Sequence, residues 1–502
     1  MNVNQFKLHG KYLKSFYFLL VFSLFYIFPI VLANFYYIDD LTRSIVNYVG
    51  WARDARPLTA ALTVLLNGGE PLMDISPLMQ VGTVVFLDYA IIVFLKKFIV
   101  EYSAFKIFLA AALGYANLFL LENFSFKYDS FSMIVSLGIF LLLYAFPEDA
   151  NRITTLLLSV LVVIISLCMY QASIGAYISL AVVESIYLIY RNEPVRKIFE
   201  RVLLRIIGIG IGGIIYFKLI VPYFTDSPGY SLYHAGILDV FSSIGLQKAF
   251  GHASAFMELF KDYVISLGYI CPVLILAAFV GIICLAVDIW NRRNESVYVK
   301  SLFIMYIMSC PLLLIGASII ALVILENPVY LPRALISVTV FTLFIGIILC
   351  YLSQQSRIAI VISLMAVIYT LAFSSSYGNL LYRQDRMDSL VASYLVYDMN
   401  RAESKGEIKI DKVSFLGESP RSRELLLEKF RRPLFDRLVP AYMDNDWYWG
   451  RVYLLHYKRN WLEAQNDPKD LEYVKNNIPV SSNEFYKLYL HGDKFIVCFP
   501  HQ

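Results

Sequence analysis

Charged residues are scarce in this sequence of 502 residues. Only 16% of the residues are Asp, Glu, Lys or Arg, whereas 58% are hydrophobic. Soluble domains carry about 25% charged residues. The composition therefore excludes an ordinary soluble protein, and we expect the lipid bilayer to be the main solvent of the chain.

Cysteine is also scarce, and its placement excludes a disulfide framework or a zinc site. Of the six cysteines, Cys498 alone lies outside the long apolar runs of the chain, and their spacing matches no zinc motif. The two histidines of a long polar loop, His234 and His252, are far apart and form no metal-binding motif. We therefore expect no metal ion and no other cofactor.

The chain lacks a nucleotide-binding loop and a cleavable signal peptide. Glycines cluster at 208–213, but no strand precedes them and they lie inside an apolar run. This setting favours close helix packing over phosphate binding. The first apolar run has no convincing small-residue cleavage site, so we expect the protein to retain it as a membrane span.

Long apolar runs dominate what is present. About eleven of them are long enough to cross a ~30 Å hydrocarbon core as helices. The predicted fold class is therefore an all-α polytopic membrane protein. The expected spans are 15–35, 77–96, 104–121, 130–147, 153–170, 172–190, 203–222, 266–289, 301–325, 334–353 and 357–376.

Basic residues set the predicted orientation of these spans. Lys7, Lys11 and Lys14 precede the first span, and Lys and Arg recur in alternate connections such as 191–205. Such segments face the cytoplasm, which places the N-terminus inside and the tail outside. We therefore divide the chain into a transmembrane domain, 1–376, with outer loops 36–76 and 223–265, and a soluble outer domain, 377–502.

The tail is charged and has the patterning of a small α/β domain. Alternating apolar residues at 407–416 predict a strand, and those at 487–499 predict a hairpin that turns at His491-Gly492-Asp493. Between them, the spacing over 421–439 predicts a helix. A domain of roughly one hundred residues lies within the usual range of domain sizes and is long enough for a core of its own.

Two adjacent carboxylates, Asp39 and Asp40, follow an aromatic cluster where the chain leaves the first span. Burial beside apolar rings and a neighbouring like charge both raise the pKa of a carboxyl group, which suits a general base. Such a base can take a proton from a sugar hydroxyl. The alternative is that both residues only cap an interfacial helix, because Asp is a favoured N-cap residue.

Further charged side chains lie in the outer turns. Arginine binds phosphate through paired hydrogen bonds, and the aromatic and acidic turn at 122–129 suits carbohydrate. Snorkelling to lipid head groups, or an aromatic belt, would explain the same residues without a site. The candidate phosphate ligands are Arg53, Arg56, Lys127 and Arg333, and the candidates for binding or orienting an acceptor are Arg43, Glu122 and Asp129.

Short motifs follow one another in order along the membrane region: Tyr37-Ile38-Asp39-Asp40-Leu41-Thr42-Arg43, Arg56-Pro57-Leu58-Thr59, Asp74-Ile75-Ser76-Pro77, Glu122-Asn123-Phe124-Ser125, Tyr170-Gln171-Ala172-Ser173 and Pro332-Arg333. In these motifs the chain resembles the type II family of serotype-converting O-antigen glucosyltransferases. Ala55 stands where we associate a glycine with that family. The tail resembles the family only in general style.

The resemblance implies a GT-C class glycosyltransferase in the bacterial inner membrane, with its tail in the periplasm. It would move a hexose, usually glucose, from undecaprenyl phosphate to O-antigen, with no nucleotide sugar. In an inverting displacement, Asp39 or Asp40 would be the base and the cations would offset the charge of the departing phosphate. The implied partners are the lipid donor, the O-antigen acceptor, membrane lipids, a donor synthase and a flippase, with no nucleic acid.

Two other functions stay open at this point. A lipid-linked polysaccharide flippase would carry charges along a central path. Asp88 and Glu184 do lie inside spans, but a single interhelical hydrogen bond would account for each. An O-antigen polymerase would rely on a large outer loop such as 223–265.

Overall fold

A computed structural model shows a mostly helical protein that divides into two compact units. Unit 1 comprises residues 1–28, 49–70 and 75–375, and unit 2 comprises residues 29–48, 71–74 and 376–502. The structure describes residues 6–47, 49–147, 151–224, 236–406, 410–445, 447–457, 463–464 and 467–500. His234 and part of the predicted outer loop 223–265 lie outside the described residues.

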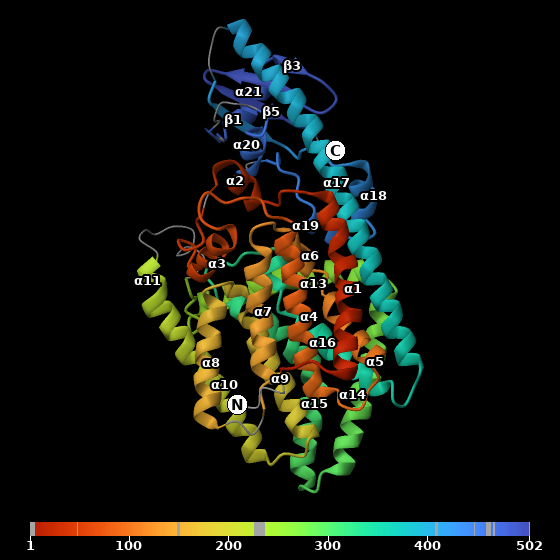
Figure 1. Cartoon of the computed structure of the whole chain (residues 1–502). Helices are drawn as coiled ribbons and strands as arrows, with labels where there is room; N and C mark the ends of the chain where they lie inside the picture. The colour runs from red at the N-terminus through yellow and green to blue at the C-terminus, as the bar shows by residue number, and fades with distance from the viewer. Residues whose placement is uncertain are drawn as a thin grey trace. The chain divides into compact units, whose positions relative to one another are not determined.

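Helices make up almost all of the described part of unit 1 (Figure 1). In chain order they are α1 (Gly10–Ala33, which ends in unit 2), α3 (Pro57–Asn67), α4 (Leu78–Phe98), α5 (Ala104–Ala112), η2 (Leu113–Ala116), α6 (Leu120–Ser125), α7 (Ser130–Tyr144), α8 (Arg152–Leu167), η3 (Gln171–Ser173), α9 (Ile174–Tyr190), α10 (Val195–Ile215), η4 (Tyr216–Ile220), α11 (Val221–Phe224), α13 (Ser243–Leu267), α14 (Ile270–Arg292), α15 (Val297–Val323), η5 (Pro332–Leu335) and α16 (Val338–Leu352).

Among the described residues, seven helices are long and apolar enough to cross a membrane. They are α1, α4, Gln171–Tyr190, Val195–Phe224, α14, α15 and α17 (Ile358–Gly406). Shorter apolar helices at Ala104–Ala116, Ser130–Tyr144, Arg152–Leu167 and Val338–Leu352 coincide with four further predicted spans. The chain is therefore a membrane protein, and the count of about eleven spans stays a prediction.

Small residues bring two helices of unit 1 close together. Helix α10 packs on α8, and a Cβ atom added to Gly208 would lie 2.5 Å from the Cβ of Ser159. At Gly212 the same atom would lie 2.8 Å from Cγ1 of Val163. The glycine-rich stretch therefore serves helix packing, as predicted.

Two acids inside the spans tie helices together. Asp88 of α4 accepts hydrogen bonds from Ser23 at 2.6 Å and Tyr115 at 2.7 Å, which confirms an interhelical role. Glu184 of α9 pairs with Arg205 of α10 through contacts of 2.9 and 3.0 Å. Lys97 and Arg201 also lie within 4 Å of Glu184, so this acid forms an ion-pair cluster instead of the single hydrogen bond expected.

Unit 2 contains a five-stranded sheet in the order β2-β1-β5-β4-β3. β1 runs parallel to β2 and β5, whereas β4 runs antiparallel to β3 and β5. The strands are β1 (Lys412–Leu416), β2 (Glu463–Ala464), β3 (Ser481–Ser482), β4 (Lys487–His491) and β5 (Lys494–Cys498). The predicted hairpin is confirmed, and its turn uses Gly492 at a φ of 60°.

Unit 2 differs in two places from the sequence prediction. The helix predicted over 421–439 is two short helices, because Pro433 interrupts it. The predicted strand 407–416 begins at Lys412 in the structure, and residues 407–409 lie outside the described part. Besides the ends of α1 and α17, the described helices of this unit are α2 (Asp39–Val46), α18 (Arg423–Lys429), α19 (Leu434–Leu438), α20 (Trp449–Leu454) and α21 (Asp470–Asn476).

Helix α17 continues beyond the predicted end of the last span at residue 376. It is one helix of 49 residues that reaches Gly406 (Figure 1). The change in composition near Asn379 therefore marks a change of surroundings and not the end of the helix. Beyond that point, buried apolar residues such as Leu381, Val391 and Leu395 keep a helical spacing.

Candidate functional site

The predicted site residues fall into both units. Asp39, Asp40 and Arg43 belong to unit 2, and the remaining candidates belong to unit 1. The two groups are described separately. Those of unit 1 are Arg53, Arg56, Glu122, Lys127, Asp129 and Arg333.

Arg56 occupies the N-terminal end of α3 in unit 1. It is the N-cap residue, and Pro57 follows it at the first helical position, where a missing N–H is tolerated. Its guanidinium lies 5.2 Å from the centroid of the Tyr170 ring. Among the described residues Arg56 forms no ion pair, and its Nε atom is buried without a hydrogen-bond partner. A half-buried cation with this much free bonding capacity suits an anionic ligand.

Arg333 is held differently, by the buried acid Glu122. The Arg333 Nη1 atom lies 3.0 Å from Glu122 Oε1, and the Arg333 backbone N–H donates to Oε2 at 2.7 Å. Glu122 is 1% exposed and Arg333 side chain 15% exposed. The Tyr170 hydroxyl donates to the Arg333 carbonyl at 3.1 Å, which fixes η5 from a second side. Glu122 therefore orients Arg333 and balances its charge.

Asp129 and Lys127 are buried in the turn before α7. The indole N–H of Trp51, itself fully buried, donates to Asp129 Oδ1. This bond links the loop that contains Trp51 to the turn at 122–129. Arg53, by contrast, is exposed and lies on the outside of its turn.

Sequence reasoning missed two residues that contact the Arg56 turn. Gln171 donates to the backbone carbonyl of Asp54, and the Tyr216 hydroxyl donates to that of Ala55. Gln171 was visible only as part of a family motif. No sequence pattern pointed to Tyr216, because the residue that it contacts is 161 positions away in the sequence.

In unit 2, Asp39 and Asp40 occupy the first turn of α2, where acids interact favourably with the helix dipole. Ile38 takes the N-cap position without a side-chain cap hydrogen bond, so simple capping does not describe the two acids. Asp40 is fully buried and accepts a hydrogen bond from the Tyr37 backbone N–H at 3.3 Å. Asp39 is partly exposed, and Arg43 is buried one turn further along.

Residues of the tail support this turn within unit 2. The Tyr442 hydroxyl donates to the Tyr36 carbonyl at 2.6 Å and accepts from the Ile38 backbone N–H at 3.1 Å. The Tyr37 hydroxyl donates to the Leu438 carbonyl at 2.8 Å. Since these bonds fix the backbone on both sides of Ile38, they also fix the two acids that follow it.

Tyr36 lies close to acids of the same unit. Burial, first of all, and the nearby carboxylates of Asp74 and Asp40 together raise the pKa of the Tyr36 hydroxyl to about 12. The side-chain hydrogen bond between Tyr36 and Asp74 acts in the same direction. Tyr36 therefore stays protonated at neutral pH and acts as a hydrogen-bond donor.

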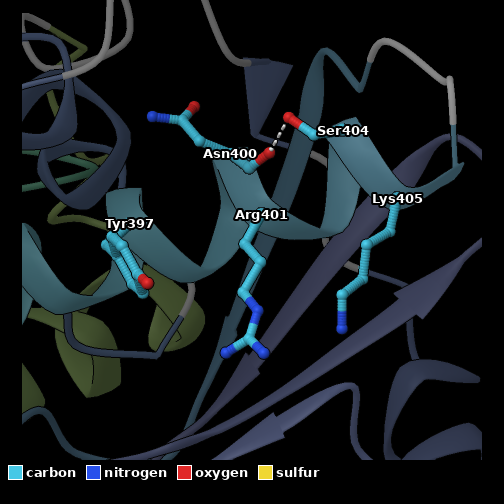
Figure 2. A pocket seen from close by; sticks show the side chains of 5 residues that line it. All are labelled: Tyr397, Asn400, Arg401, Ser404 and Lys405. Atoms are coloured by element: carbon cyan, nitrogen blue, oxygen red, sulfur yellow. Dashed lines mark hydrogen bonds between the residues drawn. The ribbon is translucent and has the colours of Figure 1, made fainter.

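A separate hollow of about 440 Å³ lies along the last turns of α17 (Figure 2). Its lining contains two cations but no carboxylate, so it offers no general base. None of the predicted site residues lines it. The lining residues are Tyr397, Asn400, Arg401, Ser404 and Lys405.

Metal ligands are not clustered in the part of the chain that the structure describes. No group of three or more His, Cys, Asp or Glu side chains there is arranged to hold a metal ion. His252 lies instead with its Nδ1 atom 3.1 Å from the Val323 carbonyl oxygen and its ring against Tyr330.

Comparison with known proteins gives one family match and one relative. A family model described as "Glucosyl transferase GtrII" matches residues 28–350. A protein of Salmonella phage P22, described as an uncharacterized 55.3 kDa protein in the gtrB 5' region, is 23% identical over 486 residues. That alignment covers 95% of this chain and 96% of the phage protein. No solved structure was found to match.

Proposed function

Because this chain belongs to the GtrII family of glucosyl transferases, we propose that it is an inverting GT-C class enzyme of the bacterial inner membrane. It takes glucose from undecaprenyl phosphate and adds it to O-antigen in the periplasm. Glucosyl transfer follows from the family, and the membrane setting follows from the apolar helices. The donor lipid, the stereochemistry and the side of the membrane are the proposal.

The proposal of a lipid-phosphate donor rests on the surroundings of the Arg56 side chain. A polyprenyl-linked sugar presents a phosphate at the membrane surface, and that phosphate needs a cation. Arg56 has no acid partner in the described structure and lies on the Tyr170 ring. Arg333 has its charge balanced by Glu122, so we assign Arg56 as the main phosphate ligand. Arg53, Lys127 and Arg333 take supporting roles.

The reaction proposed is a single displacement at the anomeric carbon. An acceptor hydroxyl oxygen attacks this carbon and gives its proton to a carboxylate, while the bond from the carbon to the phosphate oxygen breaks. Polyprenyl phosphate leaves as a phosphate monoester with increased negative charge. A fixed cation lowers the barrier by offsetting that charge, and this is the role of Arg56.

Burial distinguishes the two candidate bases. Asp40 is fully buried and accepts a backbone hydrogen bond, so its carboxylate is occupied inside the fold. Asp39 is partly exposed in the same helical turn. A general base has to reach the proton that it removes, so we assign Asp39 as the base and Asp40 as a positioning residue.

The acids and the arginine predicted to handle the acceptor are buried. Glu122, Asp129 and Arg43 each have little exposed surface, so we propose that they orient neighbouring groups instead of touching the sugar. Glu122 does this for Arg333, and Asp129 for Trp51. The periplasmic tail is the proposed holder of the polysaccharide, and a separate synthase and flippase supply the donor.

The assignment of the base is tested with Asp39→Asn and Asp40→Asn in membranes that contain equal amounts of each protein. We expect Asp39→Asn to lose on the order of 10²–10⁴ in the rate of glucose transfer, with little change in KM for the lipid donor. Asp411→Asn, which removes an exposed acid of unit 2, serves as the control. Full activity of Asp39→Asn would reject this residue as the base.

A further inference from the structure

The backbone turn that carries Arg56 is held by two side chains from distant segments of unit 1. Ala55 is 5% exposed and has a φ of 59°, a left-handed conformation that alanine rarely adopts. Its carbonyl accepts a hydrogen bond from the Tyr216 hydroxyl at 2.7 Å. Gln171 Nε2 donates to the Asp54 carbonyl at 3.1 Å and to the Tyr216 hydroxyl oxygen at 2.9 Å. The three groups therefore form a connected network around one strained residue.

Tyr216 reaches this turn from an irregular part of its helix. The chain stays helical through α10, η4 and α11, and η4 is a π-helical turn of five residues. Single π-helical turns inside α-helices are rare and are found frequently at functional sites. Tyr216 is the first residue of this turn and is buried. Packing therefore fixes its ring while the hydroxyl points to the Ala55 carbonyl.

A left-handed alanine has to be held by its surroundings, because an isolated chain would relax to a negative φ. Rotation about the N–Cα bond of Ala55 would move its own carbonyl group and, after it, Arg56. The turn itself contributes backbone hydrogen bonds, among them those from the Arg56 N–H to the Trp51 carbonyl at 2.7 Å and from the Ala55 N–H to the Ala52 carbonyl at 3.0 Å. Neither of these two backbone bonds reaches the Ala55 carbonyl, which accepts hydrogen bonds from the Tyr216 hydroxyl at 2.7 Å and, more weakly, from Gln171 Nε2 at 3.4 Å.

We propose that Tyr216 and Gln171 are positioning residues that keep Ala55 left-handed and so set the direction of the Arg56 side chain. This inference rests on the proposed function, in which Arg56 binds the donor phosphate. Neither residue touches the donor in this account, since both act through the backbone of residues 54–55. Loss of the Tyr216 hydroxyl therefore weakens donor binding and also slows the chemical step, because Arg56 serves both.

The first experiment does not depend on activity and measures how strongly Tyr216 stabilises the backbone turn before Arg56. Hydrogen exchange of the full-length protein in lipid nanodiscs is compared for wild type, Tyr216→Phe and Tyr263→Phe. Tyr263 is a matched control, because its buried hydroxyl also donates to a backbone carbonyl, that of Ala116, at 2.9 Å. We expect exchange in the peptide 52–58 to quicken by about 3- to 10-fold in Tyr216→Phe only. Equal exchange rates in all three proteins would overturn the claim that the Tyr216 hydroxyl stabilises this turn.

The effect of Tyr216→Phe on use of the lipid donor is measured by determining KM and kcat separately. We expect Tyr216→Phe to raise KM for undecaprenyl-phosphate-glucose by about 3- to 10-fold and to lower kcat as well, since a displaced Arg56 offsets less charge on the departing phosphate. If KM stays at the wild-type value while exchange quickens, the positioning of Arg56 is overturned. If wild type transfers nothing from this donor, the proposed function fails, whereas the exchange result still decides whether Tyr216 holds the turn.

Ala55→Gly separates this local role from a general packing role of Tyr216. Glycine adopts a positive φ without strain, so the turn should need the Tyr216 hydroxyl less. In the Ala55→Gly background we expect Tyr216→Phe to change exchange and KM by less than half as much, on a logarithmic scale, as it does alone. Effects of the same size in both backgrounds would contradict the inference.

Discussion

At the scale of single residues, the charges of unit 1 differ in what balances them. Arg333 forms an ion pair with Glu122, and the Asp129 carboxylate accepts a hydrogen bond from the Trp51 indole N–H. Arg56 packs on the Tyr170 ring and follows a backbone turn, but it forms no ion pair with an acid among the residues that the structure describes. A cation in this state is already partly desolvated and is free to bind an anion, which is why it is the preferred phosphate ligand in this account.

Replacement of Arg56 tests this preference. Arg56→Gln should lower kcat/KM for the lipid donor by on the order of 10²-fold, because a fixed cation at the departing phosphate is lost. Arg56→Lys should recover only part of the activity, since lysine cannot form paired hydrogen bonds. Initial rates at varied donor concentration provide the measurement.

Arg386→Gln is the control for this experiment. Its guanidinium also lies on an aromatic ring, 5.0 Å from the centroid of Tyr382, but it belongs to unit 2 and to no proposed site. Transfer by Arg386→Gln should stay close to wild type. Equal losses in the two arginine variants would argue against a specific role of Arg56.

The sequence identified many of these residues but not their partners. Arg56, Glu122 and Arg333 could be chosen because charged and aromatic residues gather in the turns that were predicted to lie outside the membrane. The pairing of Glu122 with Arg333 spans 211 positions and left no pattern. Tyr216 could not be chosen, because a tyrosine near the end of an apolar run is an ordinary interfacial residue until its hydroxyl is located.

At the scale of secondary-structure elements, close packing of α8 and α10 depends on which face of α10 each glycine occupies. Gly208 faces α8, where an added Cβ would lie 2.5 Å from the Cβ of Ser159. Gly210 faces open space, with no heavy atom within 4 Å of its added Cβ. The two positions are two residues apart and so differ chiefly in what they face.

This difference gives a paired prediction. Gly208→Ala should destabilise the protein by about 1–3 kcal/mol, because the helices have to separate to admit the methyl group. Gly210→Ala should be neutral or slightly stabilising, since alanine is the better helix former. Thermal unfolding in detergent at fixed lipid content measures both. The packing assignment would be wrong if the two variants shifted the Tm equally.

Periodicity predicted the elements where one pattern ran without interruption. The hairpin of β4 and β5 followed from its alternation and from Gly492, which permits the tight turn. The last span was predicted to end at residue 376, where the sequence becomes charged, and the continuation of α17 to Gly406 was not predicted. The helical pattern of 421–439 continued across Pro433, where the structure begins a new helix.

At the scale of the whole molecule, the distribution of basic residues makes the strongest prediction about orientation. Arg191 begins a connection rich in Lys and Arg, whereas Glu418 lies in the tail. The proposed topology places these two positions on opposite sides of the membrane. A membrane-impermeant maleimide can distinguish them in intact spheroplasts.

The labelling experiment uses single cysteines in a cysteine-free background. Glu418→Cys should react at once from the periplasm, and Arg191→Cys should react only after the membrane is permeabilised. Both positions are exposed, so access to the reagent depends on the side of the membrane. The reverse pattern would place the tail in the cytoplasm and remove it from any periplasmic acceptor.

The central claim is that this family member takes glucose from a polyprenyl phosphate, and it is tested most directly with the purified full-length chain in lipid vesicles. Radiolabelled undecaprenyl-phosphate-glucose and O-antigen are supplied, and the label in polysaccharide is counted, with UDP-glucose as the competing donor. The account predicts transfer from the lipid donor and none from UDP-glucose. Transfer from UDP-glucose alone would contradict it.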